Sequence, residues 1–251
     1  MKRRQFLAGL CGSCSIGGLW YVRRSPKRTI DIRFWLSARA ARYEDITPRI
    51  ASYLEAAFGP VYADVDVSYG GVVQTRTEHG FGVMRTGEWP ARVAVGTANS
   101  AGIDPVDDVN LLVTDGPMTQ TPSGAGILHL ASVGGARYIG EAPPREEVDD
   151  VVSYTTPARV VQVLIHEVGH ALGLAHDHGA ITNGEGTTVA SPMVSTYAWA
   201  SDPRSRREFD ADHSACGGLY PADRGGRRKL SYTFSSCATA KLREYRGGLH
   251  P

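Results

Sequence analysis

His166-Glu167-Val168-Gly169-His170-Ala171-Leu172-Gly173-Leu174-Ala175-His176 is the stretch from which the fold of the whole chain can be argued. It has the form H-E-x-x-H-x-x-G-x-x-H. Residues four apart on a helix share a face, so His166 and His170 can direct two imidazoles to one metal ion. Gly173 can adopt the left-handed conformation that ends a helix, which would return His176 as a third ligand. Three protein ligands and one open position are typical of catalytic zinc, whereas structural zinc has four ligands.

Glu167 follows the first ligand, about 100° further round the helix. From there its carboxylate can reach a water molecule on the metal instead of the metal itself. The plainer alternative is a pair of ordinary helix histidines with a glutamate between them. A glycine and a third histidine at fixed offsets make chance agreement much rarer. We therefore predict one zinc ion held by His166, His170 and His176, with Glu167 as general base.

The flanking residues predict that this stretch belongs to a helix that runs from Pro157 to about Gly173. Thr156-Pro157 is a start signal, with Thr156 as N-cap and proline at the first helical position. Apolar residues at helical spacing then form one stripe, and the histidines lie mainly off it. The residues of the stripe are Leu164, Val168, Ala171 and Leu172. We expect a helix that is buried on one side and carries the metal on the other.

The long motif resembles the signature of the metzincin metalloproteases. Other stretches resemble the matrixin-like branch: a methionine turn, a C-terminal helix, a loop and an edge strand. The methionine turn is Ser191-Pro192-Met193, and the C-terminal helix is Phe209-Asp210-Ala211-Asp212 leading to Gly218-Leu219-Tyr220. The loop is Asp115-Gly116-Pro117, and the edge strand is Gly126-Ile127-Leu128-His129.

The resemblance implies an α+β, zincin-like fold in residues 29–251. The upper lobe, about 29–176, would be a twisted mixed sheet with two helices. The lower lobe, about 177–251, would be small and irregular with a C-terminal helix. The zinc cleft would lie between them, and Met193 would support the zinc from below, unless it is an ordinary core methionine.

The function that the resemblance implies is a zinc-dependent endopeptidase. A zinc-activated water would attack the peptide bond with Glu167 as general base. The protein or peptide substrate would lie extended along an edge strand, for which we expect residues 126–132. The alternatives are a catalytically silent zinc-binding module and an envelope-anchored module with the same fold. Intact Glu167 argues against a silent site, because binding alone needs no general base.

His129 resembles a matrixin position that binds a second, structural zinc ion, but the usual downstream partners are absent. We therefore expect His129 to be an edge-strand side chain. Calcium is common among such enzymes, yet no loop shows a full pattern of oxygen ligands. Calcium stays open without a motif to support it.

Residues 1–28 are typical of a targeting segment. Arg3-Arg4 followed by an apolar run resembles a twin-arginine export signal. An uncleaved membrane anchor is the alternative, because no clean cleavage site precedes Arg23. Cys11 and Cys14 are poorly placed for lipid attachment. We expect an exported protein, secreted or at the cell surface, whose membrane contact is limited to this segment.

Composition limits the remaining classes. The chain has 251 residues and 42% apolar content, enough for one sizeable domain. Seven of its 27 basic residues precede Asp31, which leaves 20 basic against 26 acidic residues in the body. A mildly acidic body gives no reason to expect nucleic acid as a partner, and we expect a monomer. Cys216 and Cys237 are an even pair outside the signal and predict a disulfide, unless they are two separate thiols.

Periodicity and turn residues predict the other elements. A helix over 47–58, started by Thr47-Pro48 and ended by Gly59-Pro60, would join two parallel strands. Strands are predicted at 30–36, 61–69, 92–95, 109–114 and 127–132, and a short helix at 208–215. Loops or surface connections are predicted at 115–126, 138–154 and 177–192, and the tail after Ala222 has no clear pattern.

Overall fold

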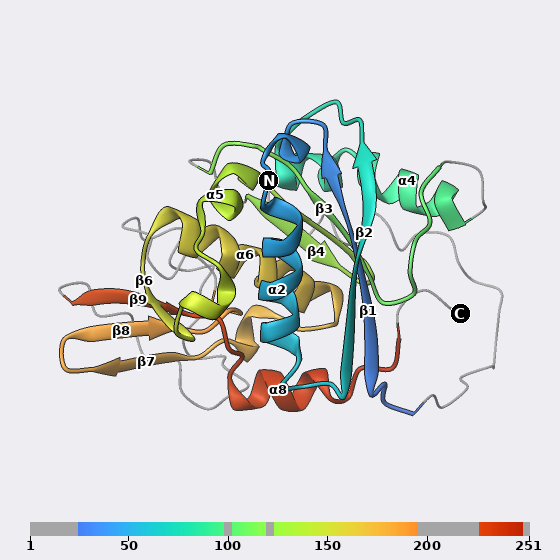
Figure 1. Ribbon diagram of the computed structural model, residues 1–251. Coiled ribbons are helices and arrows are strands. Elements are labelled where there is room, and N and C mark those ends of the chain that lie inside the picture. Colours follow the sequence, from blue (N-terminus) through green and yellow to red (C-terminus); the bar gives the residue numbers. More distant parts are fainter. Residues whose placement is uncertain (1–24, 98–101, 119–122, 195–225, 248–251) are drawn as a thin grey trace, which may run out of the picture.

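The computed structural model describes residues 25–97, 102–118, 123–194 and 226–247. It contains two mixed sheets and several helices, which confirms the predicted α+β class (Figure 1). The larger sheet has the order β2-β1-β3-β5-β4, in which β4 is antiparallel to β5 and the other neighbours are parallel. Its strands are β1 (Thr29–Ser37), β2 (Asp64–Val73), β3 (Val109–Val113), β4 (Gly124–Ile127) and β5 (Leu130–Val133).

Helices cover both faces of this sheet. The main core lies on the face of α2 (Ile46–Phe58), α5 (Ala136–Glu141) and α6 (Thr156–Ala171). A smaller apolar cluster lies on the other face, where α3 (Gly80–Arg85) and α4 (Glu88–Thr97) pack. Figure 1 shows α2 and α4 on opposite sides of β1 and β2. The parallel pairing of β1 and β2 around α2 agrees with the sequence prediction.

The alternation in β1 follows from this two-sided packing. Ile30, Ile32, Phe34 and Leu36 belong to the main core. Trp35 points to the other face, where its ring lies 5.2 Å from that of Trp89 on α4. The second half of β1 is therefore buried on both faces, not on one as the pattern predicts.

The predicted strand at residues 92–95 is wrong, because these residues belong to α4. The indole nitrogen of Trp89 donates to the backbone oxygen of Asn110 at 3.1 Å, which ties α4 to the sheet. Trp89, Val93 and Gly96 are the buried residues of this helix, at helical spacing. A four-residue apolar window is too short to distinguish this pattern from a strand.

The predicted strand at 127–132 is also wrong in its bounds. Residues 126–132 span the end of β4, a two-residue turn and the start of β5, with Ile127 paired to Leu130. The edge strand is therefore Gly124–Ile127, which begins inside the predicted loop 115–126. His129 lies in the turn and not on the edge strand, and burial lowers its pKa.

Three segments for which we predict loop or no structure form a second sheet. Its order is β6-β9-β8-β7. The strands are β6 (Val151–Ser153), β7 (Ile181–Gly184), β8 (Thr187–Ala190) and β9 (Arg227–Ser231). Residues 138–154 also contain the end of α5 and a 3-10 turn, Arg145–Glu147. The sheet joins β6, from the range assigned to the upper lobe, to strands of the lower lobe.

The C-terminal part ends in α8 (Ser236–Leu242), which carries Cys237. The predicted helix 208–215 and Cys216 lie outside the described residues, so that helix and the disulfide stay predictions. Within the described parts of the chain, no helix is both long and apolar enough to cross a membrane.

The loop after β3, which resembles the matrixin loop, is fixed by a buried carboxylate. Asp115 accepts hydrogen bonds from the Tyr43 hydroxyl at 2.9 Å and from Nε and Nη2 of Arg137 at 3.1 and 3.0 Å. Gly116 packs so closely that an added Cβ would lie 2.1 Å from the backbone oxygen of Glu78. This stretch therefore anchors α5 to the sheet.

Candidate metal centre

Helix α6 carries the motif, and its two ends are defined by local hydrogen bonds. Its N-cap is Thr155, whose hydroxyl accepts from the Ala158 N–H at 3.2 Å, so the cap predicted at Thr156 is one residue late. At the other end Gly173 has φ +91°, as predicted. Gly173 and Leu174 then donate their N–H groups to His170 and Gly169 at 3.0 and 2.9 Å, which is the hydrogen-bond pattern of a Schellman motif.

The turn at Gly173 brings the third histidine to the first two. The Nε2 atom of His170 lies 2.9 Å from that of His166 and 3.1 Å from that of His176, and the third separation is 3.2 Å. Tetrahedral zinc with Zn–N distances of 2.0–2.1 Å requires separations of about 3.3 Å. Within the described residues these three form the one group of metal-ligating side chains found. The donor set therefore fits one zinc ion.

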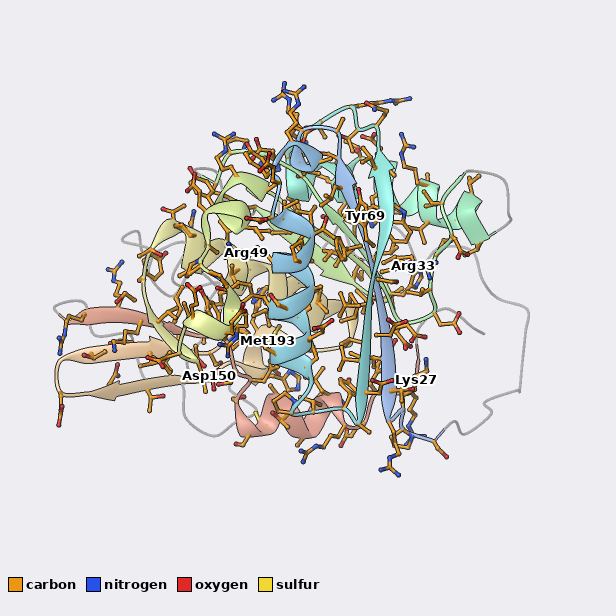
Figure 2. All side chains as sticks on the ribbon, in the orientation of Figure 1. Lys27, Arg33, Arg49, Tyr69, Asp150 and Met193 are labelled. Carbon is orange, nitrogen blue, oxygen red and sulfur yellow. The ribbon has the colours of Figure 1, made fainter. Side chains whose placement is uncertain are left out.

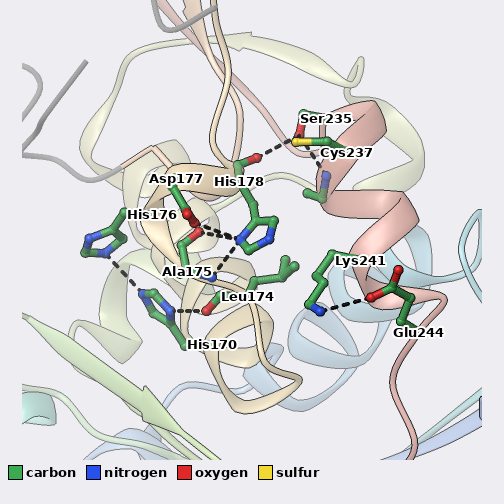
Figure 3. Close-up of polar contacts among 11 residues, drawn as sticks. His170, Leu174, Ala175, His176, Asp177, His178, Ser235, Cys237, Lys241 and Glu244 are labelled. Atoms are coloured by element: carbon green, nitrogen blue, oxygen red, sulfur yellow. Dashed lines mark hydrogen bonds and ion pairs between the residues drawn. The ribbon is translucent and has the colours of Figure 1, made fainter. Parts of the chain in front are cut away.

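The other nitrogen of two rings fixes which atom faces the centre. Nδ1 of His166 lies 2.6 Å from the Pro192 carbonyl oxygen. Nδ1 of His170 lies 2.8 Å from the carbonyl oxygen of Leu174 (Figure 3). A neutral imidazole has one proton, so a ring that donates from Nδ1 presents a bare lone pair at Nε2. Lone pairs that converge within 3.2 Å repel one another unless a cation lies between them. Backbone carbonyls in this position are the usual outer partners of metal-bound histidines.

Burial keeps the three rings neutral. It lowers the pKa of His166 well below the usual value, and the neighbouring His170 and His176 lower it further. Burial also lowers the pKa of His170, and it brings that of His176 to about 4, with a further contribution from His170. Neutral imidazole is the form that binds a metal ion. The triad is therefore in its ligating form at neutral pH.

Glu167 is almost fully buried beside the triad. Its carboxylate lies against the edge strand, where a Cβ added at Gly124 would come within 2.8 Å of Oε1. Burial raises the pKa of Glu167 to about 8. Positive charge on the adjacent triad favours the ionised form of such a carboxyl. The proton affinity of this carboxyl therefore depends on what the triad holds.

Met193, labelled in Figure 2, is fully buried beneath α6. A Cβ added at Gly169 would lie 2.7 Å from the Met193 sulfur, so this sulfur contacts the helix between the first two histidines. The glycine of the motif at this position allows that approach. Met193 therefore packs against the helix that carries the motif, and its role in supporting zinc stays a prediction.

Strand β4 lies beside the triad, and within the described residues only one of its two edges pairs with another strand. Gly134 donates its N–H to the Ser123 oxygen at 2.9 Å, so residues 123 and 134 form a hydrogen-bonded pair. Hydrogen-bonded pairs alternate along an antiparallel ladder. The backbone groups of Gly124 and Gly126 therefore point away from β5. A Cβ added at Gly126 would lie 2.7 Å from Cβ of His170, which places this free edge directly beside the triad.

The four residues predicted from the sequence, His166, Glu167, His170 and His176, lie together in the structure. The groups that orient and pack against them are not evident from the motif. These are the carbonyls of Pro192 and Leu174, the glycine pair Gly124 and Gly126, and the buried amide of Gln162. The sequence does indicate that Gln162 is unusual, because it is a polar residue within the apolar run Val160–Ile165, one turn before His166. The Leu174 carbonyl lies within the motif itself, four residues after His170, whereas the Pro192 carbonyl and the two glycines depend on contacts distant in sequence.

No family model matches the chain, and no curated protein matches it. Among solved structures, the crystal structure of archaemetzincin from Methanopyrus kandleri is similar over 85% of this chain and 94% of that chain, with 16% sequence identity and a TM-score of 0.44. A likeness this distant carries no argument about function. Function is therefore inferred from the geometry of the histidine triad and its surroundings.

Proposed function

We propose that the chain is a zinc-dependent endopeptidase of metzincin type, of the matrixin-like branch that its motifs resemble. The observation that carries the proposal is the convergence of three Nε2 atoms within 3.2 Å, two of them in rings whose Nδ1 atoms contact carbonyl oxygens, beside a buried glutamate. His166, His170 and His176 would hold the ion. When bound, zinc supplies Lewis acidity, which lowers the pKa of water and polarises a carbonyl oxygen.

Glu167 performs the proton transfers in this proposal. Its carboxylate takes a proton from the attacking water and passes it to the amine that leaves. The carbonyls of Pro192 and Leu174 hold the histidine rings in place during these steps. No covalent intermediate with the enzyme is required, so no nucleophilic serine or cysteine is assigned.

The substrate would be a protein or peptide held in extended form along β4. An extended chain can pair with the outward backbone groups of Gly124 and Gly126. Because these residues have no side chain, their backbone lies close to α6, and the paired peptide bond comes close to Glu167 and the triad. This geometry favours main-chain recognition of an unfolded segment over recognition of a small molecule.

The test compares the zinc-loaded protein with Glu167→Gln on an unfolded protein substrate. Glutamine keeps the size of the side chain and cannot accept the proton, so we expect the rate to fall by about two to four orders of magnitude. Zinc content should stay the same, because Glu167 is not a ligand. Glu185→Gln, an exposed glutamate in the turn between β7 and β8, is the matched control and should keep full activity.

Three outcomes would contradict the proposal. Equal cleavage by the wild type and Glu167→Gln would mean that another group is the base. A wild type that holds zinc and cleaves no unfolded protein would favour the silent or envelope-anchored zinc module. Wild type that holds no zinc would remove the metal centre altogether.

We also propose that residues 1–28 direct export, that membrane contact is limited to this segment, and that the body is a monomer. Oxidising conditions after export would allow Cys216 and Cys237 to pair. Fusion of residues 1–28 to a reporter protein, with and without Arg3→Lys and Arg4→Lys, tests the export signal. Titration of thiols in the denatured protein before and after reduction tests the disulfide.

A further inference from the structure

Gln162 is a buried polar side chain on α6, one helical turn before His166. It is 4% exposed. Its amide nitrogen donates one hydrogen bond to the Ala190 oxygen at 2.9 Å and another to the Ser231 oxygen at 3.3 Å. Both hydrogens of the amide are therefore used, and each reaches the last residue of a different strand, β8 or β9.

The first of these strand ends leads directly to the metal centre. Ala190 is followed by Ser191 and Pro192, and the Pro192 oxygen lies 2.6 Å from Nδ1 of His166. Two successive turns of α6 thus bind the same three-residue segment, through Gln162 and then through His166. Residues four apart on a helix share a face, which explains why one short segment meets both.

The segment 190–192 has a second attachment, near the third ligand. Ser191 donates its N–H to the Ala180 oxygen at 3.0 Å, and its hydroxyl accepts from the Ala180 N–H at 2.9 Å. Ala180 follows His176 by four residues. The segment that carries the Pro192 carbonyl is therefore held between the first and third histidines, and Gln162 is the side chain that joins it to β9.

We infer that Gln162 is a positioning residue of the metal centre. It holds the Ala190 carbonyl, and through the short chain to Pro192 it fixes the carbonyl that orients His166 and keeps its proton on Nδ1. The inference rests on the proposed zinc site but not on peptidase activity. It assigns to the second sheet a function: β8 and β9 support the first metal ligand from outside the motif.

The test measures zinc affinity in Gln162→Met, by competition with a chromophoric chelator. Methionine has a similar length and no hydrogen to donate, so it keeps the packing and removes both hydrogen bonds. We expect affinity to fall about tenfold, because loss of outer partners of metal-ligating histidines weakens binding by 10–100-fold. Gln162→Glu should lose at least one of the two hydrogen bonds, because a protonated carboxyl has one hydrogen to donate and an ionised one has none. The absorption spectrum of the cobalt-loaded protein should also change.

Val161→Ala is the matched control. Val161 is fully buried in the main core on the same helix, about 100° round from Gln162, so its truncation destabilises the fold and leaves the Gln162 amide in place. It should keep wild-type zinc affinity. If Gln162→Met does not fold, Gln162→Asn is the second variant for the same test. Asparagine keeps the amide on a side chain one methylene shorter, so we expect a smaller loss of zinc affinity.

Wild-type zinc affinity in folded Gln162→Met and Gln162→Asn, together with a lower melting temperature, would overturn the positioning role and leave a purely structural one. Failure of the wild type to bind zinc would overturn both this inference and the proposed function. Zinc binding without cleavage would overturn the peptidase alone, because zinc affinity is measured without substrate.

Discussion

Two glycines set the distance between the edge strand and the helix that carries the metal ligands. A Cβ at Gly126 would lie 2.1 Å from the backbone oxygen of Glu167, and one at Gly124 would lie 2.8 Å from its side chain. Backbone atoms cannot move out of the way as the end of a flexible side chain can. The position of β4 over the triad therefore depends on the absence of two side chains.

Gly126→Ala should push β4 away from α6 by a fraction of an ångström or more. We expect unfolding free energy to fall by about 1–3 kcal/mol, as in other overpacked sites. Cleavage should fall by about 100-fold, because small displacements of reacting groups are that costly. Gly184→Ala on β7 has nothing within 4 Å of the added Cβ and is the control. Equal activity in both variants would exclude β4 as the substrate strand.

At the scale of elements, the sequence predicts the helices and strands whose signals lie within or next to their own residues. The motif helix, β1, α2, β2 and β3 each show their own periodicity or stop signal. The second sheet does not, because the parallel pairing of β8 with β9 joins segments about forty residues apart with no repeating pattern. The same holds for the site. Its candidate ligands lie within eleven residues, whereas the Pro192 carbonyl and the acceptors of the Gln162 amide come from the ends of β8 and β9.

One link between elements depends on a single charge. Asp108, fully buried just before β3, accepts from Lys27 at 2.7 Å through both oxygens, and from the Tyr245 hydroxyl at 3.2 Å after α8. Lys27 precedes β1, at the lower end of the sheet in Figure 2. Asp108 therefore joins the residues before β1 to the segment that follows α8.

Lys27→Met should leave the Asp108 carboxylate buried without a counter-charge. We expect a loss of about 2–3 kcal/mol in unfolding free energy, less than for a fully buried pair because Lys27 is partly exposed. Urea unfolding followed by fluorescence measures this. Lys241→Met, which breaks the exposed pair with Glu244, is the control and should cause no measurable loss. A loss as small as that of the control would show that Asp108 does not need Lys27.

At the scale of the whole molecule, buried tyrosines make stability sensitive to alkali. Burial raises the pKa of four of them above the usual value of about 10, and in Tyr245 the neighbouring Asp108 raises it further. Tyr62 donates its hydroxyl to the Leu242 oxygen at 3.0 Å, so its ionisation would also break a bond to α8. The four residues are Tyr53, Tyr62, Tyr232 and Tyr245.

A raised pKa in the folded state means that the folded protein keeps protons that the unfolded chain releases above pH 10. Stability from these groups is therefore complete below pH 10 and is lost as the pH rises further, by at most about 1.4 kcal/mol per pH unit for each group. Urea unfolding of the metal-free protein at pH 8, 9, 10 and 11 measures the decline. Tyr62→Phe should start lower and decline less steeply, and an unchanged slope would exclude Tyr62 as a source.

The place of β9 in the second sheet has a consequence for biosynthesis. The strand lies between β6 and β8 in space, yet it leaves the ribosome after both. Until Ser231 has been made, the amide of Gln162 lacks its second acceptor and β8 lacks its inner neighbour. The nascent chain therefore carries the whole histidine motif for about fifty-five residues of synthesis before the last of its supports, the Ser231 carbonyl, has been made. If the proposed activity depends on these supports, it can arise only after the Ser231 carbonyl has been made.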